Sequence, residues 1–92
     1  MIESFRQKSL RDFFETGRGK GIRSDLRRRV AERLDVLDNV TKLEDLNLPG
    51  YSFHALKGEG KGRHAISVNG PWRITFEWDG ENAVKVDLEQ YH

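Results

Sequence analysis

Seven residues in the second half of the chain, WRITFEW at positions 72–78, constrain its fold more than any other stretch. Aromatic or aliphatic residues alternate with polar ones at a period of two, which is the pattern of a β-strand with one buried face. The expected core face consists of Trp72, Ile74, Phe76 and Trp78. Arg73, Thr75 and Glu77 then project from the opposite face, so chemistry-bearing side chains are expected there.

Turn signals on both sides extend this strand into a sheet. Asn69-Gly70 is a strong hairpin signal before it, and Asp79-Gly80 marks a turn after it. The run from Ala83 to Leu88 predicts a last strand, and the run from Tyr51 to Leu56 an earlier one. The glycine-rich GEGKG at 58–62 predicts a loose loop. The second half therefore predicts a series of antiparallel hairpins.

The first half has helical patterning instead. Ile2 and Phe5 suggest a short opening strand. The apolar residues of the longest helix recur at spacings of four, four and three, which is one helical face; they are Leu26, Val30, Leu34 and Leu37. A shorter helix before it is expected to end at Gly17. The expected helix starts are Ser9, Ser24 and a capping box of Thr41 with Glu44.

Helices followed by strands indicate an α+β fold, and 92 residues indicate one domain over residues 1–92. Helices on one face of a single sheet would leave its other face open. The chain has no cysteine, which excludes disulfides and thiolate metal sites. It shows neither a signal peptide nor an apolar run that could span a membrane, so a cytoplasmic protein without membrane contact is expected.

Charge is unevenly distributed although its net value is only +1. Residues 1–30 hold nine Lys or Arg against four Asp or Glu, and residues 51–76 hold four against one. Such basic segments can collect phosphates, although a solvated surface of mixed charge is the commoner explanation. The GRGKG at 17–21 lacks the spacing of a phosphate loop, and Arg27 to Arg29 point in different directions around a helix.

Histidine and cations recur in the sheet-forming half. His54 and Lys57 lie close together on one expected strand, and Arg73 has the planar fork suited to an anion. Any one of them alone is more often an ordinary surface residue. The three histidines have no metal-ligand spacing, so no metal site and no cofactor are expected. Two histidines with a lysine, an arginine and a tyrosine suffice for metal-free RNA cleavage, because RNA supplies its own 2′-OH nucleophile.

The segments FHALKG and SVNGPWRITF, together with the closing Tyr-His, resemble the HigB branch of the RelE/ParE toxin superfamily. The resemblance covers nearly the whole chain. It implies a RelE-like small domain, with N-terminal helices on one face of a mixed, mostly antiparallel sheet. It also implies a type II toxin that enters the A site of the 70S ribosome and cuts translated mRNA. The implied partner is a helix-turn-helix antitoxin of the HigA type, through which alone the toxin would reach operator DNA.

Carried over by position, the resemblance implies an active site of His54, Lys57, Arg73, Tyr91 and His92. The two histidines would act as acid and base, and the lysine and arginine would hold the phosphate. The tyrosine would position or stack on an RNA base. Weaker RNA contacts are expected from other cations, namely Arg18, Lys20, Arg23, Lys61 and Arg63.

Two departures from the family pattern keep alternatives open. Gln90 stands where relatives usually carry an acidic residue, with Glu89 one position earlier, and Arg63-His64 stands where aromatic residues are common. A degraded, non-catalytic relative that binds RNA or antitoxin is one alternative reading. A ParE-like gyrase poison on the same fold is another, although the set of His54, Lys57, Arg73 and His92 argues against it.

Overall fold

The structure is a computed structural model that describes residues 1–90. Two α-helices come first, α1 (Lys8–Thr16) and α2 (Arg27–Asn39), followed by a 3-10 turn, η1 (Leu43–Leu46). The second half contains β1 (His54–Ala55), the turn η2 (Gly58–Gly60), β2 (His64–Asn69), β3 (Trp72–Trp78) and β4 (Ala83–Gln90). Neighbouring strands pair antiparallel in the order β1-β2-β3-β4. The α+β class is confirmed.

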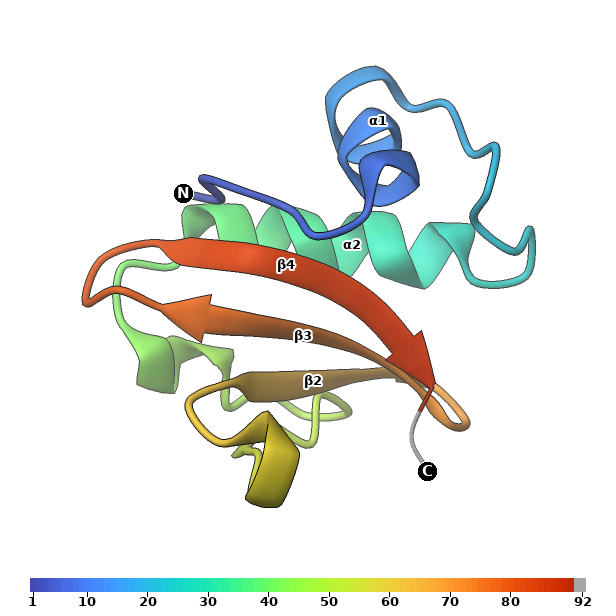
Figure 1. Cartoon of the computed structure of the whole chain (residues 1–92). Coiled ribbons are helices and arrows are strands. Elements are labelled where there is room, and N and C mark those ends of the chain that lie inside the picture. The colour runs from blue at the N-terminus through green and yellow to red at the C-terminus, as the bar shows by residue number, and fades with distance from the viewer. Residues whose placement is uncertain (91–92) are drawn as a thin grey trace.

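Both helices lie on one side of this sheet, with α2 packed across it and α1 above α2 in Figure 1. The fully buried side chains of the layer between them come from every large element: Leu10, Val30, Leu34, Leu37, Ile66, Ile74, Phe76 and Val86. The helical spacing from Leu26 to Leu37 identified core residues correctly, as did Ile74 and Phe76 of β3, whereas Trp72 and Trp78 are half-buried and Thr75 is buried. Neither helix within the described residues could cross a membrane.

The first residues of the chain run beside β4, in the parallel direction, through isolated bridges from Ile2 to Ala83 and from Phe5 to Val86. The expected opening strand is therefore present only as these two contacts, and they make an otherwise antiparallel sheet mixed. The Ser4 hydroxyl lies 2.8 Å from the backbone N–H of Lys85, which donates to it. This segment covers the outer edge of β4 (Figure 1), an edge that would otherwise expose unpaired backbone groups.

The expected helix starts were wrong. Helix α1 begins at Lys8 with Ser9 already inside it, α2 begins after Leu26 rather than Ser24, and η1 begins after Lys42. None of these starts has a side-chain cap. The α1 start is instead tied to the sheet, because the Gln7 side chain donates to the Leu88 carbonyl over 3.1 Å. Gly17 does end α1, at a left-handed φ of 78°, as expected.

The sheet departs from a regular ladder at two points. In β4, Lys85 and Val86 stand opposite the single Phe76 of β3, and Lys85 has a φ of 52°. This β-bulge turns both Ala83 and Val86 toward the helices, which strict alternation would forbid. The β2–β3 hairpin is present, but its two loop residues are Gly70 and Pro71 rather than Asn69-Gly70. Gly70 has a φ of 54°, which a residue with a side chain adopts only under strain.

Candidate active site

A hollow of about 140 Å³ lies on the side of the sheet that faces away from the helices. It is formed by the segment before β1, the end of β2, the hairpin loop and the start of β3. Its lining residues are Ser52, His54, Ser67, Gly70, Pro71, Trp72 and Arg73. Two of the expected site residues, His54 and Arg73, therefore line the same hollow although nineteen positions separate them in the sequence.

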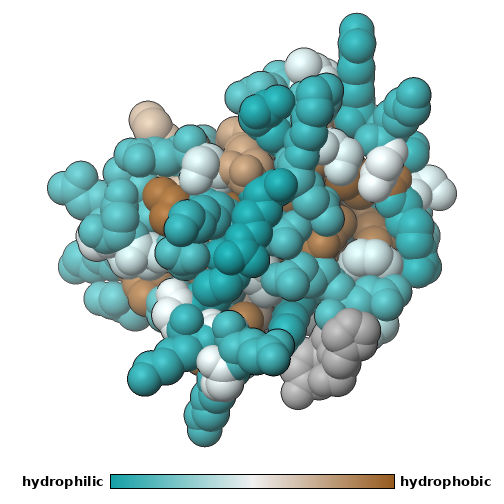
Figure 2. Space-filling view, viewed as in Figure 1, coloured by the Kyte–Doolittle hydropathy of each residue, from teal (hydrophilic) through white to brown (hydrophobic). Residues whose placement is uncertain are grey.

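Strand register explains why these two side chains meet. Directly paired residues of antiparallel strands project from the same face. His54 pairs with Ala65 and Ala65 with Thr75, while Ser67 pairs with Arg73. These pairs form two neighbouring rows on the face away from the helices. Figure 2 shows that hydrophilic side chains dominate this view of the molecule, in which the sheet lies in front of α2.

The imidazole of His54 is oriented by the backbone two residues before it. Its Nδ1 lies 2.8 Å from the carbonyl oxygen of Ser52. A carbonyl can only accept, so Nδ1 carries the proton of this bond, and in the neutral ring Nε2 is left to accept another proton. Ser52 has a φ of 46°, an uncommon left-handed conformation for a serine. The strained backbone thus aims a carbonyl at His54 and selects the tautomer in which Nε2 is free to act as a general base.

The other expected catalytic residues are placed less fully. Lys57 is exposed beyond β1, at the start of η2, and does not belong to the lining of this hollow. Tyr91 and His92 lie outside the described residues. Gln90, the last described residue, pairs with Trp72, and Trp72 lines the hollow. Strand β4 therefore ends beside the wall of the candidate site.

A carboxylate that sequence reasoning left out of the site lies on the same face. Glu89 pairs with Arg73 across β3 and β4, whereas Gln90 pairs with Trp72 on the helix-facing side. Directly paired side chains are neighbours, with Cβ atoms about 4.5–5.5 Å apart. The Thr75 hydroxyl donates to Oε2 of Glu89. The face that carries His54 and Arg73 therefore includes an acidic residue, one position before Gln90.

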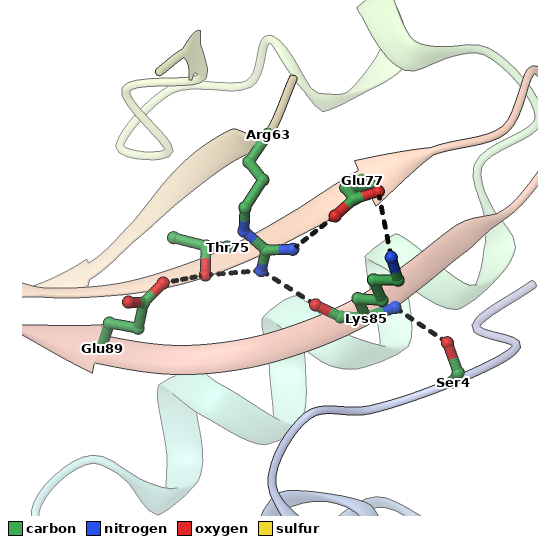
Figure 3. Close-up of polar contacts among 6 residues, drawn as sticks. All are labelled: Ser4, Arg63, Thr75, Glu77, Lys85 and Glu89. Atoms are coloured by element: carbon green, nitrogen blue, oxygen red, sulfur yellow. Dashed lines mark hydrogen bonds and ion pairs between the residues drawn. The ribbon is translucent and has the colours of Figure 1, made fainter. Parts of the chain in front are cut away.

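Arg63, expected as a surface contact for RNA, is instead buried, with only 6% of its surface exposed. Its guanidinium donates to the Thr75 hydroxyl over 3.0 Å and to the Lys85 carbonyl over 2.8 Å, and lies 3.4 Å from Oε2 of Glu77 (Figure 3). Burial lowers the pKa of Arg63 from its usual value. The side chain stabilises the β4 bulge, and it also covers Thr75, so the expectation of an open sheet face was wrong at this point.

Burial also affects the pKa of a neighbouring carboxylate on this face. Asp87 pairs with Thr75 across β3 and β4. Its pKa is raised above the ordinary value, chiefly by burial and further by the charge of Glu89, although the Leu88 backbone N–H that donates to it acts in the opposite direction. The centre of the face therefore carries closely spaced carboxylates whose charge Arg63 and the Thr75 hydroxyl partly offset.

His64 lies on the opposite side of the sheet from His54. Its ring packs between Phe53 and Phe76, with centroids 5.7 Å from each, and burial lowers its pKa below 6.5. Its Nδ1 is buried and has no hydrogen-bond partner among residues 1–90. His64 is thus a neutral packing residue, and the two described histidines do not converge on one site.

The remaining expected RNA contacts are surface residues. Lys61 is exposed after η2, and Arg18 and Lys20 line a separate hollow beside α1. The Arg23 guanidinium lies 5.8 Å from the ring centroid of Trp72 and 2.6 Å from the Asp25 carboxylate. Only Arg23 of this set therefore contacts a residue that lines the candidate site.

The chain was compared with known proteins. The family described as "RelE-like toxin of type II toxin-antitoxin system HigB" matches residues 3–92. Endoribonuclease HigB of Proteus vulgaris is 37% identical over 92 residues, which is the full length of both chains. Toxin HigB-1 of Vibrio cholerae is 34% identical over 93 residues, covering 99% of this chain and 98% of that protein. The chain therefore belongs to the HigB family of RelE-like toxins of type II toxin–antitoxin systems.

Proposed function

We propose that this toxin is a ribosome-dependent endoribonuclease that cuts translated mRNA in the A site, without a metal ion. The observation that carries the proposal is the orientation of His54, whose Nδ1 bonds the Ser52 carbonyl and whose ring shares a hollow with Arg73. The Proteus vulgaris relative bears the name endoribonuclease, which supports the same reaction class.

In the proposed reaction, Nε2 of His54 takes the proton of the ribose 2′-OH. The 2′ oxygen then attacks the adjoining phosphorus, and the bond from phosphorus to the 5′ oxygen breaks. The products are a 2′,3′-cyclic phosphate and a 5′-OH end. Arg73 stabilises the negative charge that develops on the phosphoryl oxygens, as its delocalised cation is suited to do. Proton removal by a positioned base contributes roughly 10²–10⁴-fold to such a reaction.

The remaining roles follow the family resemblance. His92 is proposed as the acid that protonates the leaving 5′ oxygen, Lys57 as a second cation on the phosphate, and Tyr91 as a platform for an RNA base. We add Glu89 to this set of residues, because its carboxylate lies on the sheet face that carries His54 and Arg73.

The family assignment implies an antitoxin partner. We propose one of the HigA type, a helix-turn-helix protein that neutralises the toxin and brings it to operator DNA. The other proposed partners are the 70S ribosome and its mRNA, which locates the action in the cytoplasm. No cofactor is proposed.

The test combines an RNA with translating 70S ribosomes, the purified toxin, and mapping of the chemistry at the cut ends. Wild type is expected to cut only when ribosomes are present and to leave cyclic phosphate and 5′-OH ends. His54→Ala is expected to cut about 10²–10⁴-fold more slowly. Arg73→Ala is compared with Arg11→Ala, which removes an exposed arginine of α1 outside the hollow.

Different failures identify different alternatives. Unchanged cutting by His54→Ala would remove the proposed base. Growth arrest with intact mRNA and a DNA-damage response would point to the gyrase poison. Removal of residues 91–92 with no loss of cutting would exclude Tyr91 and His92 from the reaction.

A further inference from the structure

A second hollow, of about 480 Å³, lies beside α2, and arginine dominates its walls. Its lining residues are Arg28, Arg29, Glu32, Arg33 and Gly50. Three guanidinium groups against one carboxylate make this hollow, here called the arginine groove, a place that attracts anions. The neighbouring Arg27 is turned away and bonds the Ile22 carbonyl, so the groove is not simply the arginine run of the sequence.

Two of the three arginines are held in place by the end of β2. Nη1 of Arg29 donates to the Val68 carbonyl over 3.2 Å and to Oδ1 of Asn69 over 3.3 Å. Nε of Arg33 donates to the Ser67 carbonyl over 2.6 Å, and its guanidinium lies 4.6 Å from the ring centroid of Tyr51. Anchored guanidinium groups lose less conformational entropy when an anion binds than freely moving surface cations do.

The charge of these arginines is only partly neutralised inside the groove. Nη1 of Arg33 lies 3.3 Å from a carboxylate oxygen of Glu32. The partners of Arg29 in β2 are a carbonyl and a side-chain amide oxygen, which orient the cation without cancelling its charge. Arg28 is exposed at the groove. The arrangement offers a planar, bidentate fork to a phosphate, which is the ligand that arginine suits best.

The arginine groove adjoins the candidate active site across a thin wall. Gly50 lines the groove, and Ser52 lines the active-site hollow two residues later. Tyr51 lies between them, and its carbonyl accepts a 2.6 Å hydrogen bond from the backbone N–H of Ser67. Ser67 lines the active-site hollow, and its carbonyl accepts the hydrogen bond from Nε of Arg33. Tyr51 is buried, so a polyanion that occupies both hollows passes over the edge of the sheet, along the exposed Gly50 and Ser52.

We propose that the arginine groove binds phosphates of the RNA strand next to the one at which His54 and Arg73 act. The choice of RNA rests on the proposed function. RNA is favoured because the groove lies two residues along the chain from a hollow that is suited to a phosphodiester, and because successive phosphates supply the repeated charge that several arginines need. An acidic peptide segment is the competing occupant.

The test measures binding of a fully 2′-O-methylated RNA octamer, which lacks the 2′-OH and cannot be cut by the proposed reaction. Fluorescence anisotropy is recorded over a series of NaCl concentrations for wild type and for Arg28→Gln/Arg29→Gln. Log affinity falls with log salt, and each lost phosphate contact makes this slope shallower by about 0.7 for a single strand. The double variant is therefore expected to lose about 1.4 from the slope. The matched control is Arg11→Gln/Lys42→Gln, which removes two exposed cations from elsewhere.

If the control variant lost as much from the slope, only the total charge would matter, and the proposal that the arginine groove binds RNA would be overturned. Because Arg29 also contacts β2, Arg28→Gln alone guards against a structural effect; it leaves both anchors intact and should lose about 0.7 from the slope. Octaglutamate that displaces the labelled RNA as well as unlabelled RNA does would overturn the assignment to RNA.

The ribosome assay on the same proteins separates the two proposals. A wild type that binds RNA through the groove but cuts none refutes the nuclease and leaves the groove standing. Normal cutting by wild type, with unchanged binding and cutting by Arg28→Gln/Arg29→Gln, refutes the groove and leaves the nuclease standing.

Discussion

Replacing His64 with phenylalanine should stabilise the fold, and more so in mild acid. The His64 ring packs between Phe53 and Phe76, and phenylalanine preserves that ring contact. It also removes the buried Nδ1 that lacks a hydrogen-bond partner within the described part of the chain. An unsatisfied buried polar atom costs about 1–3 kcal/mol. Because His64 is only half-buried, we expect the lower end, about 1 kcal/mol at neutral pH.

The pH dependence follows from the pKa of His64. Burial lowers that pKa in the folded state, so between the folded value and 6.5 the unfolded chain binds more protons than the native protein does. Wild type therefore keeps the full contribution of neutral His64 above about pH 6.5 and loses it as the pH falls through the folded pKa. The phenylalanine variant has no titrating group at this position. Its free energy of unfolding should therefore exceed that of wild type by a growing amount as the pH falls from 7.5 to 5.

Urea unfolding and thermal melts, both followed by tryptophan fluorescence, measure both effects. A gain of 1 kcal/mol corresponds to a rise in Tm of about 4–8 °C for a domain of this size. His54→Gln, which removes an exposed imidazole, is the control and should show no comparable widening. The reasoning would be refuted if His64→Phe and wild type had the same free energy of unfolding at neutral pH, or if their difference stayed constant down to pH 5.

Three further changes test other parts of the sheet. Asp87→Asn should stabilise the fold at pH 7, because the raised pKa of Asp87 means that the charged form present at that pH is less stable in the folded protein than the protonated form. Urea titrations should show this gain in the free energy of unfolding shrinking as the pH falls toward 3.8. Gly70→Ala should cost about 1–2 kcal/mol, seen in thermal melts, because the strain of a positive φ applies even where no neighbour is close. Glu89→Ala should lower the free energy of unfolding by about 1.5–3 kcal/mol in urea titrations, since the Thr75 hydroxyl loses its hydrogen bond to a charged group, whereas Gln90→Ala, on the other face, should not.

Local sequence pattern predicted the main elements, because the spacing of apolar residues within β3 and within α2 is enough to identify each of them. The alternation from Trp72 to Trp78 and the helical spacing from Leu26 to Leu37 both identified residues of the core. The helix starts were not predictable in the same way. Ser9 is a good capping residue, yet α1 begins earlier because Gln7 reaches the Leu88 carbonyl, a contact between residues 81 positions apart.

Part of the candidate site could also be predicted, since His54 and Arg73 lie on strands whose faces the sequence indicates. The arginine groove could not. It depends on the end of β2, where the Ser67 and Val68 carbonyls accept from Arg33 and Arg29 of α2. No periodic pattern records that a helix will cross the sheet at those two residues. Burial of Arg63 was equally hidden, because it depends on the carbonyl that the β4 bulge turns toward it.

The same bulge explains why Glu89, rather than residue 90, lies on the face that carries Arg73. Without it, Ala83 would share a face with Lys85, Asp87 and Glu89, and burying Ala83 would turn Glu89 toward the helices. With one extra residue in β4, Ala83 and Leu88 are both buried, and Glu89 faces Arg73 across the strands. Arg63 and Ser4 bond the carbonyl and the N–H of Lys85 from two sides, which fixes the bulge and therefore the face to which every later residue of β4 belongs. A glutamine at position 90 consequently removes no carboxylate from the face that carries His54, because the register gives that place to Glu89.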